Sequence, residues 1–283
     1  MNVLLLLVGL LVLISVWATV VTYSFFWCEN AWCARLAPAQ GSSLKSMVFA
    51  GMLSSIASVF FIMITHPLGM IKRLWRPGDI SAGQPIIILA HGLYHNASAW
   101  LLFRRRLQKA GFKNIFVINY SSFFTNFEKT LKEFEDFVSY AKHEVPNQPV
   151  YLIGHSLGGL LSRVYAERSK GLETPAAVIT LGSPHQGSKV AAFGLGRLAS
   201  SLIYRGPLFA AIEAGPGRLP CAGVAVISPV DNMVLPSEGM RVPYPGWAYI
   251  ETEPLSHTAM LYSKFTTKQV IEILREEMDR QRP

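Results

Sequence analysis

Charged residues are almost absent from the first quarter of the chain and common in the rest. Residues 1–71 carry only three charged side chains, Glu29, Arg35 and Lys45. The uncharged run from Val3 to Trp27 is long enough, at about 1.5 Å per residue, to cross a hydrocarbon core of roughly 30 Å as a helix. A second uncharged stretch at 47–71 contains more serine and other polar residues.

These two stretches predict helices at about 3–27 and 47–71 within a membrane-embedded segment and linker, 1–84. Aromatic residues gather in the C-terminal half of the first run, as they do at a membrane interface. A cleaved signal peptide is the alternative, but the run is long and no Lys or Arg precedes it. The second stretch either crosses the membrane or lies in the interface, so one or two transmembrane helices are expected.

Basic residues directly after the second stretch bear on orientation. Under the positive-inside rule, Lys72, Arg73 and Arg76 favour a cytoplasmic position for the following domain. Cys28 and Cys33 lie between the two predicted helices and would then face the oxidising side. There they either form a disulfide or remain two thiols.

From residue 85 onward, short apolar runs alternate with segments of helical periodicity. Apolar, β-branched runs without alternation are typical of strands buried on both faces, and they occur at 85–90, 115–120, 150–153, 177–181, 223–227 and 247–250. Helical patterns occur at 98–110, 127–143, 157–168 and 267–280. This order predicts an α/β domain, 85–283, with a mostly parallel sheet flanked by helices.

Composition excludes several classes of protein. Hydrophobic residues make up 51% of the chain and charged residues 16%, the opposite of a disordered protein. With 22 glycines and 3 cysteines, the chain is neither a collagen nor a disulfide scaffold. The net charge of +8 suits an anionic lipid surface. We expect no nucleic-acid partner, because no dense basic run is interleaved with aromatic residues.

One short motif indicates the chemistry. The sequence GHSLG at residues 154–158 fits the pattern G-x-S-x-G, directly after a predicted strand and at the start of a predicted helix. In that context a tight turn holds a serine hydroxyl above the sheet, where a base and a substrate both reach it. A glycine-rich turn without catalytic function is the alternative. We predict that Ser156 is a nucleophile.

A serine nucleophile needs a base and an acid that orients the base. In folds that use this turn, the order along the chain is serine, acid, histidine. Only His185 and His257 follow Ser156, and Asp231 is the only aspartate between Ser156 and His257. Each of Asp231 and His257 follows a predicted strand, so we predict a Ser156, Asp231, His257 triad. The fallback acids are Glu238, Glu251 and Glu253.

Two backbone N–H groups are expected to stabilise the oxyanion. One belongs to Leu157, directly after the nucleophile, and the other to the loop after the first predicted strand of the domain. That loop reads His91-Gly92-Leu93, and Leu93 is the candidate donor. We interpret His91 as a structural histidine that bridges loops and transfers no proton.

At this point the chain resembles the lipase/esterase branch of the α/β-hydrolase fold, in particular bacterial triacylglycerol lipases and related membrane-associated esterases. The matching stretches are ILAHGLYHNASAW (88–100), YLIGHSLGGL (151–160), TLGSPHQGS (180–188), SPVDNMVLP (228–236) and LSHTAML (255–261). The resemblance implies hydrolysis of carboxylic esters through an acyl-serine, with no metal or organic cofactor and with a lipid-like substrate. It does not cover residues 1–84, in which the chain departs from the secreted enzymes of that group.

Alternatives remain open for a long connection and for the substrate. Residues 187–222 join two predicted strands, and their apolar side chains suit either a movable lid or an ordinary helix that covers the sheet. The same triad serves phospholipases, thioesterases and acyltransferases. A non-catalytic membrane interaction protein is disfavoured, because every triad and oxyanion position is filled.

Overall fold

Six parallel strands form one sheet in the order β2-β1-β3-β4-β5-β6. The computed structural model describes residues 2–32 and 44–280. The strands are β1 (Ile86–Ala90), β2 (Asn114–Val117), β3 (Val150–His155), β4 (Ala177–Leu181), β5 (Ala222–Ile227) and β6 (Trp247–Glu251). The predicted α/β fold with a parallel sheet is therefore confirmed. β2 ends before the predicted 120, because the chain turns so that the Tyr120 N–H donates to His91 Nε2 at 3.3 Å.

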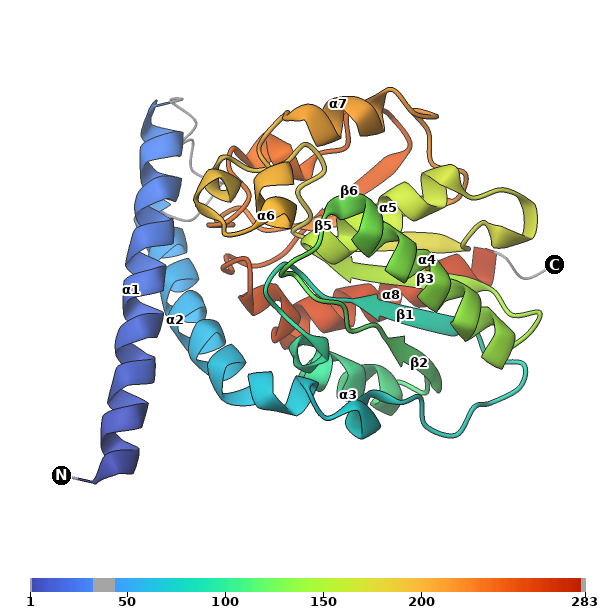
Figure 1. Ribbon diagram of the computed structural model, residues 1–283, viewed down its shortest axis with the longest axis horizontal. Coiled ribbons are helices and arrows are strands. Elements are labelled where there is room, and N and C mark those ends of the chain that lie inside the picture. Colours follow the sequence, from blue (N-terminus) through green and yellow to red (C-terminus); the bar gives the residue numbers. More distant parts are fainter. Residues whose placement is uncertain (1, 33–43, 281–283) are drawn as a thin grey trace.

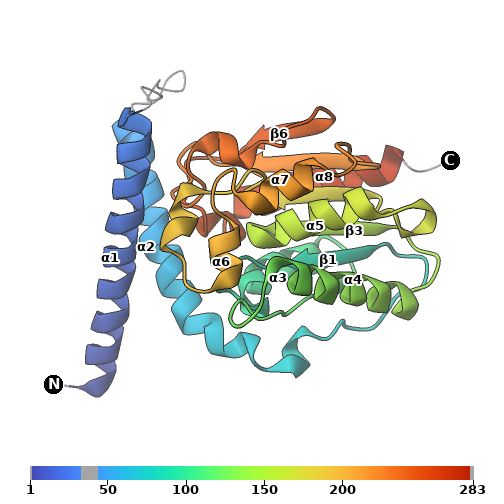
Figure 2. The same ribbon diagram turned by 45° about the horizontal axis from the view of Figure 1, so that its top comes forward.

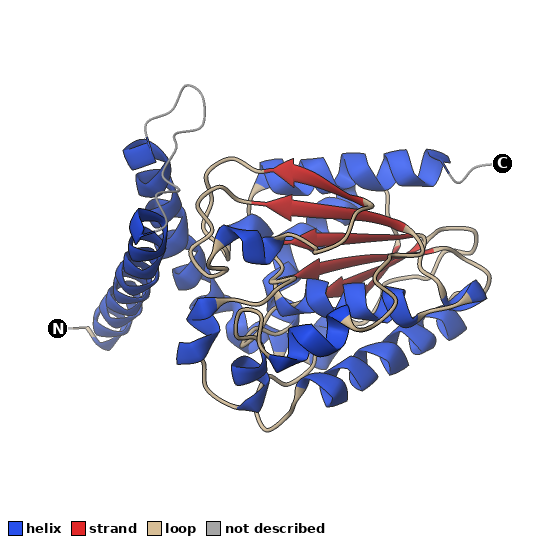
Figure 3. Ribbon diagram, turned by 90° about the horizontal axis from the view of Figure 1, so that it is seen from above, coloured by secondary structure: helices blue, strands red, loops and turns tan. Residues whose placement is uncertain are grey.

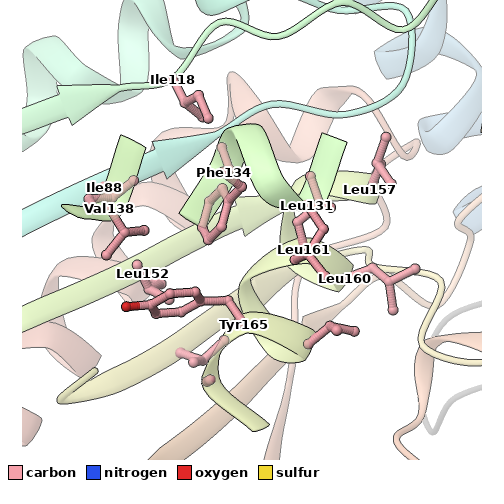
Figure 4. Close-up of a cluster of buried hydrophobic side chains, with 14 of the residues drawn as sticks. Ile88, Ile118, Leu131, Phe134, Val138, Leu152, Leu157, Leu160, Leu161 and Tyr165 are labelled. Atoms are coloured by element: carbon pink, nitrogen blue, oxygen red, sulfur yellow. The ribbon is translucent and has the colours of Figure 1, made fainter. Parts of the chain in front are cut away.

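Helices cover both faces of the sheet (Figure 3). They are α3 (Leu101–Lys109), α4 (Phe127–Glu144), α5 (Leu157–Arg168) and α8 (Lys264–Arg280). Side chains alternate along β1: Ile86 and Ile88 pack with α4 and α5, whereas Ile87 and Leu89 pack with α3 and α8. Figure 4 shows the first of these clusters, in which Phe134 of α4 is fully buried. Burial on both faces explains why the strands are apolar throughout.

Two helix boundaries differ from the predicted ones because of local hydrogen bonds. The helical segment predicted from residue 98 begins as a 3-10 turn, Ala97–Trp100, with the Asn96 side chain accepting from the Ser98 N–H at 3.0 Å. α8 begins at Lys264 rather than 267, and the Ser263 hydroxyl accepts from the Thr266 N–H at 3.1 Å.

An N-terminal hairpin of two long helices, α1 (Val3–Trp32) and α2 (Leu44–Gly69), stands beside this domain. α2 lies between α1 and the domain in both Figure 1 and Figure 2. By length and composition, Val3–Ala31 and Leu44–Gly69 are able to cross a membrane. α1 continues past the predicted end at 27, and its Glu29 carboxylate pairs with Lys189 at 2.8 Å. The prediction about Cys28 and Cys33 involves Cys33, which lies outside the described residues.

Small and hydroxyl-bearing residues join the two helices of the hairpin. The Thr19 hydroxyl donates to the Ser55 hydroxyl at 2.8 Å, and both residues are buried. Gly51 lets α2 approach α1 closely, because a Cβ there would lie only 2.2 Å from the Tyr23 hydroxyl. Small residues play this part in helix pairs whose outer faces are apolar.

The connection 187–222 contains two short helices, α6 (Arg197–Ser201) and α7 (Pro207–Glu213). Leu198 of α6 and Phe209 of α7 are buried in the same core cluster as α4 and α5. This part of the connection covers the domain core. The residues before α6 expose Phe193 and Leu195 to solvent, and a lid function for the connection stays a prediction.

Replacement of Gly51 by alanine will destabilise the hairpin, because the added Cβ overlaps the Tyr23 hydroxyl and lies 2.9 Å from Val230. We expect the free energy of unfolding to fall by about 1–3 kcal/mol, as for other overpacked sites. Thermal unfolding of detergent-solubilised protein measures the change. Gly9→Ala is the matched control, because a Cβ at Gly9 meets nothing within 4 Å. Equal unfolding temperatures for the two variants would contradict the close packing at Gly51.

Candidate active site

Ser156 sits in the turn between β3 and α5 with a left-handed backbone, φ 54° and ψ −122°. A non-glycine residue rarely adopts this conformation, and where it does so the surrounding structure must hold it. One such restraint is the Ser156 N–H, which donates to the carbonyl of Leu181 at the end of β4 at 2.9 Å. The turn thus places the serine at the carboxyl edge of the sheet.

Glycines allow this turn to form. A Cβ at Gly154 would lie 2.4 Å from the backbone of Gly158, and a Cβ at Gly158 would lie 2.2 Å from the carbonyl oxygen of Ala90 in β1. A Cβ at Gly159 would overlap the Ser183 hydroxyl. Side chains at these positions would separate α5 from β1 and β3, so the spacing of glycines around Ser156 is a steric requirement.

Asp231 and His257 form a buried pair in the loops after β5 and β6. His257 Nδ1 and Asp231 Oδ2 are 2.7 Å apart, and Asp231 is 2% exposed. The other carboxylate oxygen, Oδ1, accepts from the N–H groups of Met233 and Val234 at 2.8 and 2.9 Å. With Nδ1–H donating to the carboxylate, Nε2 is the ring atom that is free to accept a proton.

Two further residues, Asn232 and Gly182, contact the Asp231–His257 pair, and no role was predicted for either. Asn232 Oδ1 accepts from the His257 N–H at 3.0 Å and so ties the two loops together. Gly182, with φ +54°, follows β4 at a point where a Cβ would lie 2.9 Å from Asp231 Oδ2 and 3.1 Å from His257 Nδ1. Both lie in stretches that carry the family resemblance, Gly182 in 180–188 and Asn232 in 228–236, but neither was assigned a role from the sequence.

The loop after β1 lies against the nucleophile turn. A Cβ at Gly92 would be 3.0 Å from Ser156 Cβ. Leu93 lines the same cavity as Ser156, and Leu157 is the buried first residue of α5. The first N–H groups of a helix have no partner within it. The structure therefore brings the predicted oxyanion residues next to Ser156, and their donor role remains a prediction.

Residues that were weighed as alternatives have other contacts. His91 Nδ1 bonds to the Gly92 carbonyl at 2.9 Å and its ring stacks on Tyr120, so it links the loops after β1 and β2. His185 bonds to the Thr180 hydroxyl at 3.1 Å. The fallback acid Glu253 accepts from Ser263 at 2.8 Å. Asp231 is the acid that bonds to His257.

Ser156 and His257 line one cavity of about 320 Å³. Besides them, its walls contain residues from the loop after β1, from the connection 187–222, from the acid loop and from both N-terminal helices. These are Ala18, Thr22, Ser55, Val59, Gly92, Leu93, Tyr94, His95, His155, Pro184, Ser188, Val190, Ala191, Gly194, Leu202, Asn232, Met233, Val234 and Thr258. Most of these side chains are apolar or small. Among residues 2–32 and 44–280, no three His, Cys, Asp or Glu side chains gather as a metal site.

The family model described as the alpha/beta hydrolase family matches residues 87–271. The chain belongs to this family. Within the alpha/beta hydrolase domain, the match runs from β1 to α8 and includes every predicted triad and oxyanion residue.

Solved structures of other hydrolase-fold proteins share the architecture. A mature lipase of Bacillus licheniformis is 17% identical with a TM-score of 0.61, over 71% of this chain and 96% of its own. Lipase B of Aspergillus fumigatus is 14% identical with a TM-score of 0.60, over 70% of this chain and 55% of its own. Tomato methylketone synthase I is 16% identical with a TM-score of 0.50, over 70% of this chain and 99% of its own. At these identities the likeness concerns the fold alone. No curated protein sequence matches the chain.

Three buried histidines, His91, His155 and His185, and the half-buried His95 of the hydrolase domain resist protonation. Desolvation lowers the pKa of His91 to about 4 and that of His95 to about 3, from the usual 6.5. Burial, with a contribution from nearby His257, also holds the pKa of His155 well below 6.5, and burial does the same for His185. The His155 ring lies tilted beside the His257 ring, with centroids 4.6 Å apart. The imidazole of His155, which resists protonation, therefore lies beside the His257 ring.

These four histidines predict acid sensitivity of the fold. Their pKa values are lower in the folded chain than in the unfolded chain, so below pH 6.5 the unfolded chain binds more protons. The contribution of these histidines to the free energy of unfolding is fully present above that pH. It falls as the pH decreases toward 4, by up to about 1.4 kcal/mol per pH unit for each histidine. Chemical unfolding at a series of pH values measures the slope. A free energy of unfolding that stays constant between neutral pH and pH 5 would contradict this burial.

Proposed function

We propose that this chain is a membrane-associated serine hydrolase that cleaves carboxylic esters of lipid-like substrates through an acyl-serine. The observation that carries the proposal is the buried bond between Asp231 and His257, because His257 lines one largely apolar cavity together with Ser156. A left-handed serine turn, an oriented imidazole and a loop packed on the serine are the parts that acyl transfer requires.

In this mechanism, Ser156 Oγ attacks the carbonyl carbon of the ester while His257 Nε2 takes its proton. Asp231 orients the ring and stabilises the imidazolium. The N–H groups of Leu93 and Leu157 stabilise the oxyanion of the tetrahedral intermediate. When the intermediate collapses, the C–O bond to the alcohol breaks and His257 protonates the leaving oxygen. A water molecule, deprotonated by His257, then releases the acid from Ser156.

The substrate class follows from the walls of the cavity. Side chains such as Val190, Leu202 and Val234 offer contact for hydrocarbon rather than for a polar group. The two lipases among the structural neighbours are consistent with such a substrate. Lipid-like acyl esters fit this site better than small polar esters.

Membrane association rests on the outer face of α1. Most apolar side chains between Val3 and Val20 are exposed there; Leu5 is 66% exposed and Leu13 is 67% exposed. In water this surface would be a large unsatisfied apolar area. Insertion into lipid removes it from water, and the net charge of +8 adds attraction to an anionic surface. A cytoplasmic position of the domain stays a prediction from Lys72, Arg73 and Arg76.

Ser156→Ala will abolish both ester hydrolysis and labelling by a serine-directed fluorophosphonate, because the nucleophilic oxygen is removed. Turnover of a p-nitrophenyl ester by detergent-solubilised protein and in-gel fluorescence measure the two effects. Ser162→Ala is the control, because it removes another serine hydroxyl from the same region. This hydroxyl is buried in α5 and donates to the Gly158 carbonyl at 2.8 Å. Fluorophosphonate labelling that persists in Ser156→Ala would refute the assignment.

Asp231→Asn tests the acid. The amide can hold the imidazole in the wrong tautomer, and kcat is expected to fall by about 10⁴-fold, as in a serine protease with the same change. Steady-state hydrolysis measures kcat. Glu253→Gln is the control and should change kcat little, because Glu253 bonds to Ser263 rather than to His257. A loss of activity in Glu253→Gln together with an active Asp231→Asn would place the acid elsewhere.

A double substitution, Leu6→Lys with Leu13→Lys, will weaken membrane association. A lysine at the centre of a membrane helix costs about 2.5–3.5 kcal/mol, and one nearer the helix end, as at Leu6, costs less. Flotation of the protein with liposomes measures the bound fraction. Leu172→Lys is the control, because Leu172 is 95% exposed on the hydrolase domain. Equal flotation of both proteins would place the membrane contact on another surface.

A further inference from the structure

We infer that the N-terminal helices are a wall of the catalytic cavity and hold the acyl chain of the substrate, so that they determine chain-length specificity as well as membrane contact. This inference rests on the proposed ester hydrolysis and goes beyond it. It assigns acyl-chain binding to Ala18 and Thr22 of α1 and to Ser55 and Val59 of α2, which line the cavity together with Ser156 and His257.

The hairpin stands at the carboxyl edge of the sheet. The arrowheads of the parallel strands point toward the side on which α1 and α2 stand (Figure 3). The carboxyl edge of a parallel sheet carries the loops that form the active site. The hairpin therefore closes the cavity from outside this edge.

Hydrogen bonds connect the hairpin to the loops of the predicted acid and base. The Tyr23 hydroxyl donates at 3.1 Å to the carbonyl of Val230, the residue before Asp231. Ser256 is the residue before His257, and its N–H donates to the Ser54 hydroxyl at 2.9 Å. These contacts hold the wall in register with both loops, so the cavity surface on α1 and α2 has a defined position relative to the reacting atoms.

A second pair of contacts reinforces the same arrangement. The hydroxyls of Ser58 and Thr258 are 2.7 Å apart, and Thr258 directly follows His257. The Asn232 amide donates to the Thr22 hydroxyl at 2.7 Å, and Asn232 directly follows Asp231. A helix pair that served only as a tether would not require polar contacts on both sides of each catalytic residue.

The hairpin wall is chemically suited to hydrocarbon. The Thr22 hydroxyl donates to the Ala18 carbonyl at 2.8 Å and accepts from Asn232. The Ser55 hydroxyl accepts from Thr19 at 2.8 Å. With the Thr22 hydroxyl bonded both as donor and as acceptor, the wall offers a ligand mainly methyl and methylene groups, including those of Ala18 and Val59.

The same helices connect the cavity with the proposed lipid contact. α1 exposes apolar side chains on its outer face, such as Trp17 and Val20, only a few residues from Ala18 and Thr22. α1 thus presents one face to the proposed lipid contact and another face to the cavity. This arrangement favours a substrate with a long acyl chain drawn from the membrane.

Substitutions that change the volume of the wall test the inference. Ala18→Phe fills part of the cavity, so kcat/KM for p-nitrophenyl decanoate should fall by about tenfold or more relative to that for p-nitrophenyl butyrate, as the methylene contacts are lost. Val20→Phe is the matched control: Val20 is exposed on α1, and the variant should keep the wild-type ratio.

A second variant enlarges the wall. Val59→Ala should shift the preference toward p-nitrophenyl palmitate, whereas Leu53→Ala, at an exposed position of α2, should not. This arm remains informative if Ala18→Phe fails to fold. Unchanged chain-length profiles in Val59→Ala and in a folded Ala18→Phe, with an active wild type, would overturn the inference. A wild type that neither hydrolyses any of these esters nor reacts with fluorophosphonate would instead refute the proposed function.

Discussion

The close approach of backbones around Ser156 is the constraint on which the rest of the site depends. Gly158 lies where any side chain would collide with the Ala90 carbonyl, so α5 starts directly against β1. This contact holds Ser156 in its left-handed conformation at the edge of the sheet. Parallel strands then deliver the loops after β1, β5 and β6 to the same edge. The geometry of the candidate site is thus a consequence of sheet topology and of one tight turn.

The N-terminal hairpin and the candidate site form one structural unit. Thr22, Tyr23 and Ser54 are polar residues in largely apolar helices, and each is hydrogen-bonded to the loops that carry Asp231 or His257. Polar groups in a helix that contacts lipid are costly unless they find partners. Here the partners belong to the hydrolase domain. The proposed membrane contact and the shape of the cavity around Ser156 and His257 therefore depend on the same pair of helices.

Much of the architecture could be predicted because its signals are local. Strands buried on both faces are apolar without interruption, and glycines next to a serine after such a strand indicate the tight turn. Elimination then sufficed to predict Asp231 and His257, which the structure places 2.7 Å apart. Element ends were less predictable. Glu29 follows the apolar run and was expected outside the helix. In the structure it lies within α1, where its carboxylate pairs with Lys189 of the domain.

From the sequence we could predict the order of elements, the serine turn and the Asp231–His257 pair, because each depends on short-range sterics or on the few aspartates and histidines that follow Ser156. Tertiary structure alone decided that α1 and α2 lie at the carboxyl edge of the sheet, that Asn232 links the two loops, and that Gly182 leaves room for the Asp231–His257 pair. Largely apolar helices give little indication of which face will be covered. That choice is made by hydrogen-bond partners more than 200 residues away along the chain.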